Sequence, residues 1–245
     1  MFSTHAIKQD FGRAASAYDA QAHLQRQVRG YCIALAESYW KKEAHILDAG
    51  CGTGALAQEI NWHVTGIDLA FGMCVEADKN IVNADAASMP FADESFDGIF
   101  SSLMLQWAND PLAILREMRR VAKPQGRCVI STLTQGTLQE LRDSFGTSHV
   151  SAFLPAPDLL DFAAHAGFKI GLSEQATITE YYPDAMRLMQ SLKNIGAGNK
   201  QISRSKGLMT PQQLSRGARI YRQRFATAQG LPATWQVLYM VLGKS

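Results

Sequence analysis

Residues 48–54 read Asp-Ala-Gly-Cys-Gly-Thr-Gly and follow a short apolar run at residues 46–47. A helix-like segment, 55–60, comes next, and the following apolar run, 64–67, is closed by Asp68. The order is strand, glycine turn, helix, strand and acid, which in an open parallel sheet places a nucleoside site at the carboxyl ends of the strands. Glycines allow a tight turn and close approach of a ligand, and the acid accepts hydrogen bonds from ribose hydroxyls.

The glycine turn also fits the dinucleotide pattern G-x-G-x-x-G/A over residues 50–55. Three observations favour S-adenosylmethionine (SAM) over NAD. Asp48 precedes the first glycine where NAD sites usually present apolar strand, about forty residues precede the first strand, and Asp85 follows another apolar run at 81–82. Acids after consecutive strands suit an adenosine, because one can hold the ribose and the other the adenine amine.

Length and composition bound the class of protein. With 245 residues and 47% apolar content, the chain has room for one large α/β domain with a lid. The four cysteines form no C-x-x-C pair, so we expect neither disulfides nor a metal site. Residues 1–10 do not read as a signal peptide, and no apolar stretch is long enough to span a bilayer. We expect a cytoplasmic protein and, by default, a monomer.

Charge is distributed unevenly along the chain. The formal net charge is +2, but residues 183–230 hold nine basic residues against one acid, a balance of +8 that leaves −6 for the remainder. Such an asymmetry predicts an anionic partner for the basic segment. Nucleic acid, anionic lipid and an acidic carrier protein all qualify, and a merely solvated helical surface is the alternative.

Hydrophobic periodicity predicts helices over residues 4–40 and seven later strands. The strands are expected near 45–49, 63–67, 80–84, 96–101, 126–132, 168–181 and 234–242. Helices are expected at residues 158–166 and 184–194. Three more helices are predicted from signals at their starts: Asp110-Pro111, a capping box from Thr137 to Glu140, and a capping box with proline from Thr210 to Gln213.

These elements predict an α/β, Rossmann-like fold with a seven-stranded, mostly parallel sheet and a helical lid inserted between the last two strands. We expect residues 1–40 to form helices that cover the site. Residues 41–182 and 231–245 then form the nucleoside-binding core, and 183–230 the basic lid that docks the substrate.

Several motifs carry a resemblance to known enzymes. The stretch 48–54, Asp68, Asp85 and the turn Lys123-Pro124-Gln125-Gly126 resemble class I SAM-dependent methyltransferases. More selective motifs resemble the malonyl-acyl-carrier-protein O-methyltransferase (BioC) family of biotin synthesis, and the resemblance runs from about residue 8 to 244. These motifs lie at residues 11–19 with Gln25, 105–107, 192–197 and 231–235. Two departures are Gln125, where the usual turn has glycine, and Trp235-Gln236, where the family usually has Tyr-Glu.

The resemblance implies methyl transfer from SAM to the free carboxylate of malonyl on acyl carrier protein, and it implies roles for named residues. Gly50, Gly52 and Gly54 are expected to line the methionine part of SAM, with Asp48 near its amino group. Asp68 is expected to hold the ribose, and Asp85 with Ala86 the adenine. Three neighbours complete the expected cofactor site: Ala49, Leu69 and Ser102.

The acceptor side is expected to involve four residues: Tyr18 closing over the methyl group, Gln106 and Trp107 after the fourth strand, and Lys193 pairing with the malonyl carboxylate. Structural alternatives are a core tyrosine, a core tryptophan and a plain surface lysine. Arg216, Arg219 and Arg222 fall at a spacing of three, so they share one helix face on which acidic acyl carrier protein is expected to dock.

Three rival functions remain open on the sequence. One is a methyltransferase for a small carboxylic acid or a quinone precursor, although such a substrate needs few cations. Another is a SAM-binding assembly factor or protein hydroxylase that does not methylate. An RNA methyltransferase is disfavoured, because Ser101-Ser102-Leu103-Met104 stands where the N/D-P-P-Y/F motif is expected.

Overall fold

The computed structural model describes residues 1–77, 80–146, 151–195 and 209–244, with the backbone alone for 16–21. Gly196 and Ala197, the end of the motif at 192–197, lie outside these ranges. Across the described residues, no helix combines the length and the apolar character needed to cross a membrane.

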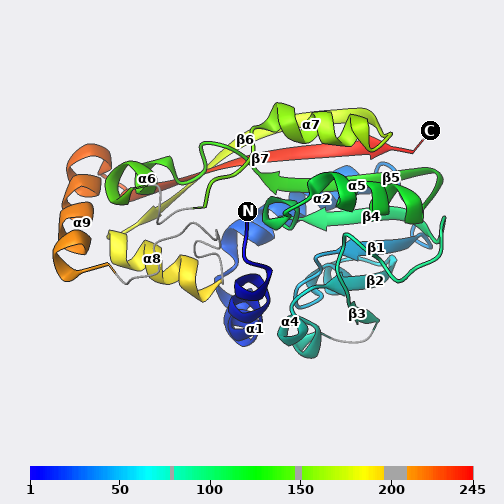
Figure 1. The fold of residues 1–245 in the computed structure, drawn as a ribbon, viewed down its shortest axis with the longest axis horizontal. Coiled ribbons are helices and arrows are strands. Elements are labelled where there is room, and N and C mark those ends of the chain that lie inside the picture. The colour runs from blue at the N-terminus through cyan, green and yellow to red at the C-terminus, as the bar shows by residue number, and fades with distance from the viewer. Residues whose placement is uncertain (78–79, 147–150, 196–208, 245) are drawn as a thin grey trace.

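One seven-stranded sheet organises the chain, in the order β3-β2-β1-β4-β5-β7-β6 (Figure 1). Its strands are β1 (His45–Ala49), β2 (His63–Asp68), β3 (Ile81–Asn83), β4 (Phe96–Ser102), β5 (Ala122–Leu133), β6 (Lys169–Tyr182) and β7 (Leu231–Gly243). Strands β1 to β5 pair in parallel, and β7 runs antiparallel to both β5 and β6. The predicted fold class is confirmed.

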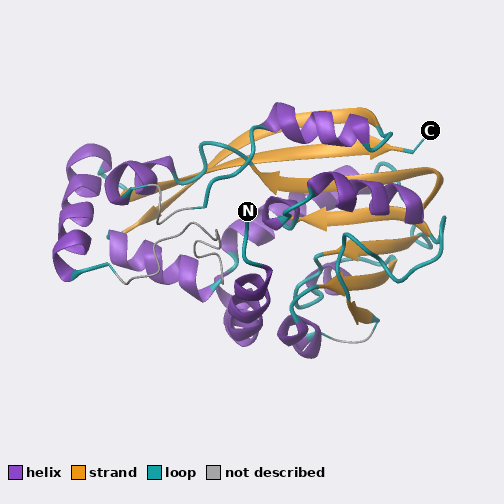
Figure 2. Cartoon of the chain, in the orientation of Figure 1, coloured by secondary structure: helices purple, strands orange, loops and turns teal. Residues whose placement is uncertain are grey.

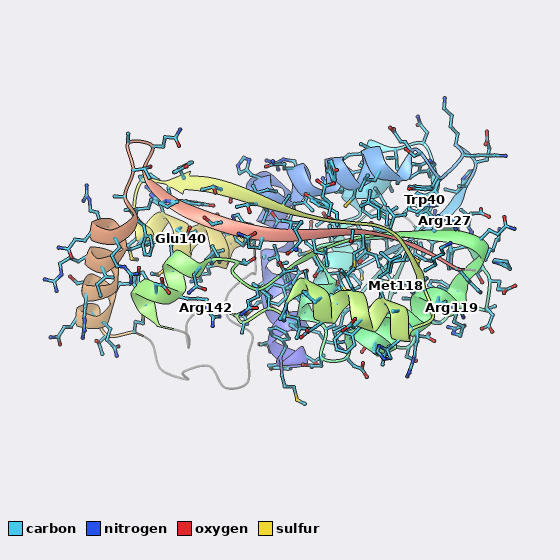
Figure 3. The ribbon with its side chains drawn as sticks, turned by 90° about the horizontal axis from the view of Figure 1, so that it is seen from above. Trp40, Met118, Arg119, Arg127, Glu140 and Arg142 are labelled. Atoms are coloured by element: carbon cyan, nitrogen blue, oxygen red, sulfur yellow. The ribbon has the colours of Figure 1, made fainter. Side chains whose placement is uncertain are left out.

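Helices cover both faces of this sheet (Figure 2). The apolar side chains of α2 (His23–Ala36) and α3 (Ala55–Glu59) share one core cluster, and those of α5 (Pro111–Val121) and α7 (Ala156–His165) share another. Figure 3 shows the two sides, with Trp40 after α2 and Met118 of α5 on opposite faces. The remaining helices are α1 (Thr4–Gln21), α4 (Phe71–Glu76), the 3-10 turn η1 (Leu105–Trp107), α6 (Gln139–Phe145), α8 (Ala185–Asn194) and α9 (Pro211–Phe225).

Side chains of β1 alternate between the two faces. Ile46 packs in the cluster of α2 and α3, whereas Leu47 and Ala49 pack in the cluster of α5 and α7. Because side chains of a strand alternate with a period of two, Asp48 faces the α2 and α3 side. Asp48, two residues before the first glycine of the turn, therefore directs its carboxylate toward these two helices.

The glycine turn after β1 needs its glycines for two reasons. Gly50, Gly52 and Gly54 all have left-handed backbones, with φ of 78°, 56° and 80°, a conformation that other residues rarely adopt. A Cβ on Gly50 would also lie 2.3 Å from Cγ of Met104, so only glycine fits there. The backbone N–H of Gly50 donates to the carbonyl of Ile67 at 2.8 Å, which fixes the turn beside β2.

Helix α1 approaches α4 backbone to backbone. A Cβ built on Gly72 would lie 2.7 Å from both Cα and the carbonyl oxygen of Gly12. Asn109, just after η1, anchors the chain before α1, because its Oδ1 accepts from the N–H of Phe2 at 2.6 Å and its Nδ2 donates to the Phe2 carbonyl at 3.1 Å. These contacts hold α1 across the carboxyl ends of the central strands.

Two helices, α8 and α9, stand between β6 and β7, as predicted. Figure 1 shows them at the far end of the long antiparallel pair of β6 and β7, beside α6 and away from β1 to β3. Helix α9 packs on α6 with Gly217 against the ring of Phe145, and the buried Tyr221 donates its hydroxyl to the carbonyl of Pro232 at 2.5 Å. Helix α8 packs on α1 and β6.

Trp235 and Gln236, which replace the usual Tyr-Glu of the family, connect the two strands of this pair. Trp235 is buried and its Nε1 donates to Oε2 of Glu180 at 3.1 Å. The Gln236 Oε1 accepts from the hydroxyl of Thr177 at 2.9 Å. Both side chains therefore bind β6 to β7. Gln125, the other departure, is exposed with a φ of 64°, which explains why glycine suits that turn better.

The two predicted capping boxes had different outcomes. Thr210 and Gln213 form one, with Pro211 at the first helical position. The box at Thr137 and Glu140 was wrong, because α6 begins after Leu138 and has no side-chain cap. Both side chains bind β7 instead: the Thr137 hydroxyl accepts from the N–H of Gln236 at 3.0 Å, and Glu140 accepts from Thr234.

Candidate active site

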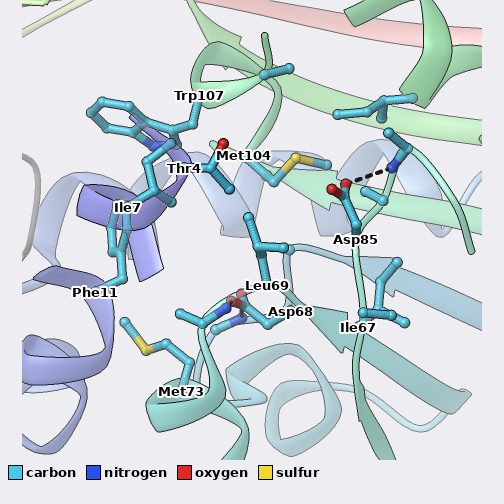
Figure 4. A pocket seen from close by; sticks show the side chains of 18 of the residues that line it. Thr4, Ile7, Phe11, Ile67, Asp68, Leu69, Met73, Asp85, Met104 and Trp107 are labelled. Atoms are coloured by element: carbon cyan, nitrogen blue, oxygen red, sulfur yellow. Dashed lines mark hydrogen bonds between the residues drawn. The ribbon is translucent and has the colours of Figure 1, made fainter. Parts of the chain in front are cut away.

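A cavity of about 240 Å³ lies at the carboxyl ends of β1, β2, β3 and β4. Asp68 and Asp85 lie on its strand side, and Ile7 and Phe11 of α1 form the opposite wall, close to Trp107 (Figure 4). Gly52 also lines the cavity. Open α/β sheets bind ligands at this edge. The position predicted from the order of acids and glycines is therefore the position of the cavity.

Asp68 is the most firmly held carboxylate in the cavity. Its Oδ2 accepts from the N–H of Gly52 at 3.0 Å, and its Oδ1 accepts from the N–H of Ala70 at 2.7 Å. Burial raises the pKa of Asp68, and these two backbone bonds oppose that rise. A carboxylate has about four acceptor positions, so Asp68 retains acceptor capacity for a diol while it ties β2 to the glycine turn.

The adenine side of the predicted site also lies in this cavity. The Asp85 Oδ1 accepts from the N–H of Ala87 at 2.9 Å, which orders the loop after β3 (Figure 4). Leu69, Ala86 and Ser102 line the cavity as well. Asp85 and Ala86 share the lining of the cavity with apolar side chains such as Leu69, a combination that suits a purine.

Asp48 lies in a separate cavity of about 130 Å³, lined also by Cys51 and Gly54. It is 4% exposed, and burial raises its pKa to about 7, with the Arg29 charge opposing the rise and the Asp68 charge adding to it. The glycine turn thus separates two spaces, because Gly50 and Gly52 line the larger cavity and Gly54 lines the smaller. Ala49 lines neither; it is buried.

Trp107 and Gln106 follow the fourth strand together but face different surroundings. Trp107 lines the large cavity and makes edge contacts with Phe2, Phe11 and Phe153 at centroid distances of 5.8, 5.7 and 5.9 Å. Gln106 is buried behind the cavity. Its Nε2 donates to the carbonyl of Leu103 at 2.6 Å, and its Oε1 accepts from the hydroxyl of Thr132 at 3.1 Å.

Leu103 explains why Gln106 is placed there. Leu103 lines the cavity with a φ of 53°, a left-handed backbone that is costly for a branched side chain. Its N–H donates to the carbonyl of Ser131 at 2.9 Å while its own carbonyl accepts from Gln106. Gln106 therefore supports the cavity wall through Leu103, and its predicted contact with the acceptor stays a prediction.

Among the remaining residues predicted to meet the substrate, those with described side chains lie apart from the cavity. The side chain of Tyr18 lies outside the described part of the chain, although its backbone belongs to α1. Lys193 is exposed in the last turn of α8. The three arginines of α9 are also exposed: Arg216, Arg219 and Arg222. None of these described side chains reaches the large cavity.

Some cavity residues were not predicted as contacts. Thr4, Ile7 and Phe11 come from α1, and Met104 and Asn109 from the segment after β4. Phe11 carried a signal, since it opens the motif at residues 11–19. Met104 and Asn109 carried no such signal, because their placement depends on contacts with Gly50 and Phe2, which are distant along the chain.

Comparison with known proteins places these features in a family. Residues 47–130 match the family model described as a methyltransferase domain. The chain is 38% identical over 222 residues to the malonyl-[acyl-carrier protein] O-methyltransferase of Serratia marcescens, covering 86% of this chain and 85% of that protein. A protein of the same name from Laribacter hongkongensis is 34% identical, over 95% of this chain and 86% of its own length.

A longer relative and a solved structure extend the comparison. The "Biotin biosynthesis bifunctional protein BioHC" of Cellvibrio japonicus is 34% identical over 97% of this chain, which spans 50% of that protein. A putative methyltransferase from Bacillus halodurans superposes with a TM-score of 0.64 at 16% identity, covering 88% of this chain and 97% of that structure, and so shares the fold.

The methyl donor follows from the domain and fits the cavity. SAM is the donor for methyltransferases of this kind, and an ordered Asp68, a cavity-lining Asp85 and close-approach glycines suit its adenosine. The dinucleotide alternative is thereby set aside. With 34–38% identity to these relatives along 86–95% of its length, the chain belongs to the malonyl-[acyl-carrier protein] O-methyltransferase family of class I SAM-dependent methyltransferases.

Proposed function

We propose that this enzyme esterifies the free carboxylate of malonyl-acyl carrier protein, an early step of biotin synthesis. The observation that carries the proposal is the identity of 34–38% to enzymes bearing that name, along most of both chains. The donor cavity at the sheet edge supports the transferase half of the reaction, and the exposed basic face of α9 supports an acidic macromolecular substrate.

The chemistry asks little of acid–base catalysis. A malonyl carboxylate is ionised at neutral pH, so it attacks without a general base. SAM, when bound, supplies an electrophilic methyl group. The tasks left to the protein are to align the acceptor oxygen and to exclude water, and alignment of that kind corresponds to effective molarities of about 10⁵–10⁸ M. Phe11 and Trp107, in edge contact, form an apolar wall suited to both tasks.

Helix α1 should matter for donor binding because it closes the cavity. In Gly72→Ala, the new methyl group would meet the Gly12 backbone at 2.7 Å and displace α1. Overpacking of this kind costs about 1–3 kcal/mol, so we expect SAM binding to weaken about tenfold by calorimetry. Gly30→Ala is the control, because a Cβ there meets nothing within 4 Å. Equal SAM affinities in the two variants would contradict this role of α1.

The carrier protein is proposed to dock on the basic face of α9, defined by Arg216, Arg219 and Arg222. In the triple arginine-to-glutamate variant we expect kcat/KM for malonyl-acyl carrier protein to fall at least about tenfold, because opposite charge governs encounter. SAM affinity should not change. Arg116→Glu on α5 is a charge-reversal control on the opposite side of the sheet, and Arg116 is also exposed.

Added salt separates docking from donor binding. Surface charges are screened over about 8 Å at physiological ionic strength, so activity on the carrier-bound substrate should fall as salt rises, while SAM affinity barely changes. An equal salt sensitivity of both would argue against docking on α9.

Lys193 stays a proposed partner of the malonyl carboxylate. If Lys193→Ala turns over the malonyl substrate as fast as wild type, Lys193 has no role in the mechanism.

The choice of acceptor distinguishes this proposal from a small-molecule methyltransferase. Free malonate and malonyl-CoA carry the same carboxylate without the carrier protein. If the proposal is right, kcat/KM is highest for the carrier-bound form, and the advantage shrinks in the triple arginine variant. Preference for a free acid would favour the small-molecule alternative.

A further inference from the structure

The backbone bend after β4 shapes part of the wall of the large cavity. Leu103 is left-handed there, and its side chain packs with the cluster of α2 and α3, whereas Met104 packs with the cluster of α5 and α7. Both side chains line the cavity. Met104 also packs on Gly50, and Figure 4 shows its side chain directed toward Asp85. The bend therefore connects the glycine turn with the expected adenine end of the cavity.

The polar groups of this bend are bound by β5 and by Gln106. The N–H of Leu103 donates to the carbonyl of Ser131 at 2.9 Å, and its carbonyl accepts from Nε2 of Gln106 at 2.6 Å. The Oε1 of Gln106 accepts from the hydroxyl of Thr132 at 3.1 Å. Just before the bend, the hydroxyl of Ser131 donates to that of Ser102 at 3.2 Å. A chain of contacts thus runs from β5 through Gln106 to the cavity wall.

The amide of Gln106 suits this position because it both donates and accepts. The carbonyl of Leu103 takes its donor group, and the hydroxyl of Thr132 takes its acceptor group. Gln106 is 8% exposed and Thr132 is 0% exposed. A buried polar group that loses its partner is costly, so the two bonds hold each other in place.

The backbone conformation of Leu103 needs such support. A left-handed backbone is unfavourable for leucine, and it persists only where the surroundings enforce it. Gln106 binds the Leu103 carbonyl from behind the wall and does not line the cavity itself. Its contacts therefore shape the wall without touching a ligand in the cavity.

We propose that Gln106 is a positioning residue for the methyl donor, held by Thr132, which keeps Leu103 left-handed and so forms the wall before SAM binds. The inference rests on SAM occupying the large cavity. Without Gln106, the backbone of Leu103 would relax in the ligand-free enzyme. Only the fraction of molecules with a formed wall would then bind SAM, and the apparent affinity falls by that fraction. This role lies on the donor side, whereas the sequence predicted a contact with the acceptor.

The first test is Gln106→Met, which keeps the length of the side chain and removes both bonds. Calorimetry without any acceptor should show SAM binding about tenfold weaker than in wild type. The demethylated product, S-adenosylhomocysteine, should lose the same factor, because it shares the adenosine. The KM for malonyl-acyl carrier protein should not change. Unchanged SAM affinity with a raised KM would overturn the proposal and make Gln106 an acceptor contact.

A second substitution shows whether Gln106 acts through the backbone of Leu103. Glycine adopts a left-handed backbone without penalty, so in the Leu103→Gly protein the further change Gln106→Met should weaken SAM binding by less than about twofold. The loss of the leucine side chain is common to both proteins and cancels in the comparison. Equal losses from Gln106→Met in the wild-type and Leu103→Gly proteins would contradict a role through this backbone.

Thr132 provides a milder variant that serves if Gln106→Met does not fold. Thr132→Val removes the hydroxyl but leaves the bond from Gln106 to Leu103, so a smaller loss of SAM affinity is expected, and Thr132→Ser should restore binding. Wild-type affinity in Thr132→Val would contradict the part assigned to Thr132.

Tyr221→Phe is the matched control for a general loss of stability. It removes a buried bond to the carbonyl of Pro232, at a residue that does not line the cavity. We expect a lower free energy of unfolding with unchanged SAM affinity. If Tyr221→Phe weakens SAM binding as much as Gln106→Met does, the effect of Gln106 is general destabilisation and the proposal fails. These measurements use no acceptor, so their failure leaves the proposed acceptor untouched.

Discussion

Asp68→Ala is expected to weaken SAM binding by about 10²–10³-fold. Hydrogen bonds to a charged group are worth about 1.5–3 kcal/mol each, and the variant loses the predicted contacts to the ribose. It also frees the N–H groups of Gly52 and Ala70, which the carboxylate now fixes. A loss of about 3–4 kcal/mol corresponds to that change in dissociation constant. Isothermal calorimetry measures it directly.

Two further variants separate the parts of this effect. Asp68→Asn keeps the shape and the bond from Ala70, but its amide group faces the N–H of Gly52, so an intermediate loss is expected. Asp85→Ala loses one bond, from Ala87, and should cost about tenfold. If Asp68→Ala binds SAM within threefold of wild type, the ribose is held elsewhere and the assignment of this cavity fails.

Asp48→Asn is expected to stabilise the ligand-free protein at pH 8 while it weakens SAM binding. The pKa of Asp48 is raised to about 7 in the folded state, first of all by burial, against about 3.9 in an unfolded chain. A raised carboxyl pKa means that the folded state binds a proton more tightly than the unfolded chain. The stability from this proton is full below about pH 3.9 and is lost as pH rises to about 7.

The size of the change follows from the same linkage. Between pH 5 and pH 8 the wild type should lose about 2–3 kcal/mol of unfolding free energy through Asp48, a loss that the asparagine variant avoids. The advantage of Asp48→Asn should therefore be larger at pH 8 than at pH 5 by that amount, as urea unfolding at the two pH values would show. An advantage that is independent of pH would contradict a buried, titrating Asp48.

The sequence predicted the position of the large cavity, because the determinants of that position are local. Asp68 and Asp85 each follow an apolar run, and parallel strands bring their carboxyl ends to one edge. The separation of Asp48 from the larger cavity was harder to foresee, since the motif presents it beside Gly50. The alternation of side chains along β1 shows that Asp48 and Ala49 face opposite sides of the sheet. It identifies the surroundings of Asp48 only once the helices on each face are known.

Features that depend on contacts between distant segments could not be predicted. The sequence T-x-x-E/Q forms a cap at Thr210, where the helix start is exposed, and fails at Thr137, where β7 competes for the same side chains. The approach of Gly12 to Gly72 likewise depends on how α1 lies across α4. The local sequence around Thr137, or around Gly12 and Gly72, therefore does not show which distant segment these residues will contact.

The residues predicted to contact the acceptor illustrate the same limit. Trp107 lies in the cavity, whereas the neighbouring Gln106 is committed to Leu103 and Thr132. Adjacent residues of one motif therefore have different surroundings, because the 3-10 turn after β4 directs successive side chains apart. A motif alone identifies the segment, and the contacts decide which residue faces the ligand.

The most direct test of the proposed reaction is incubation of the protein with methyl-labelled SAM and malonyl-acyl carrier protein. We expect label on the carrier-bound acyl group as a base-labile methyl ester, at a higher rate than on malonyl-CoA or free malonate. SAM binding without label on any carboxylate would contradict the account and would favour a SAM-binding protein with a different role.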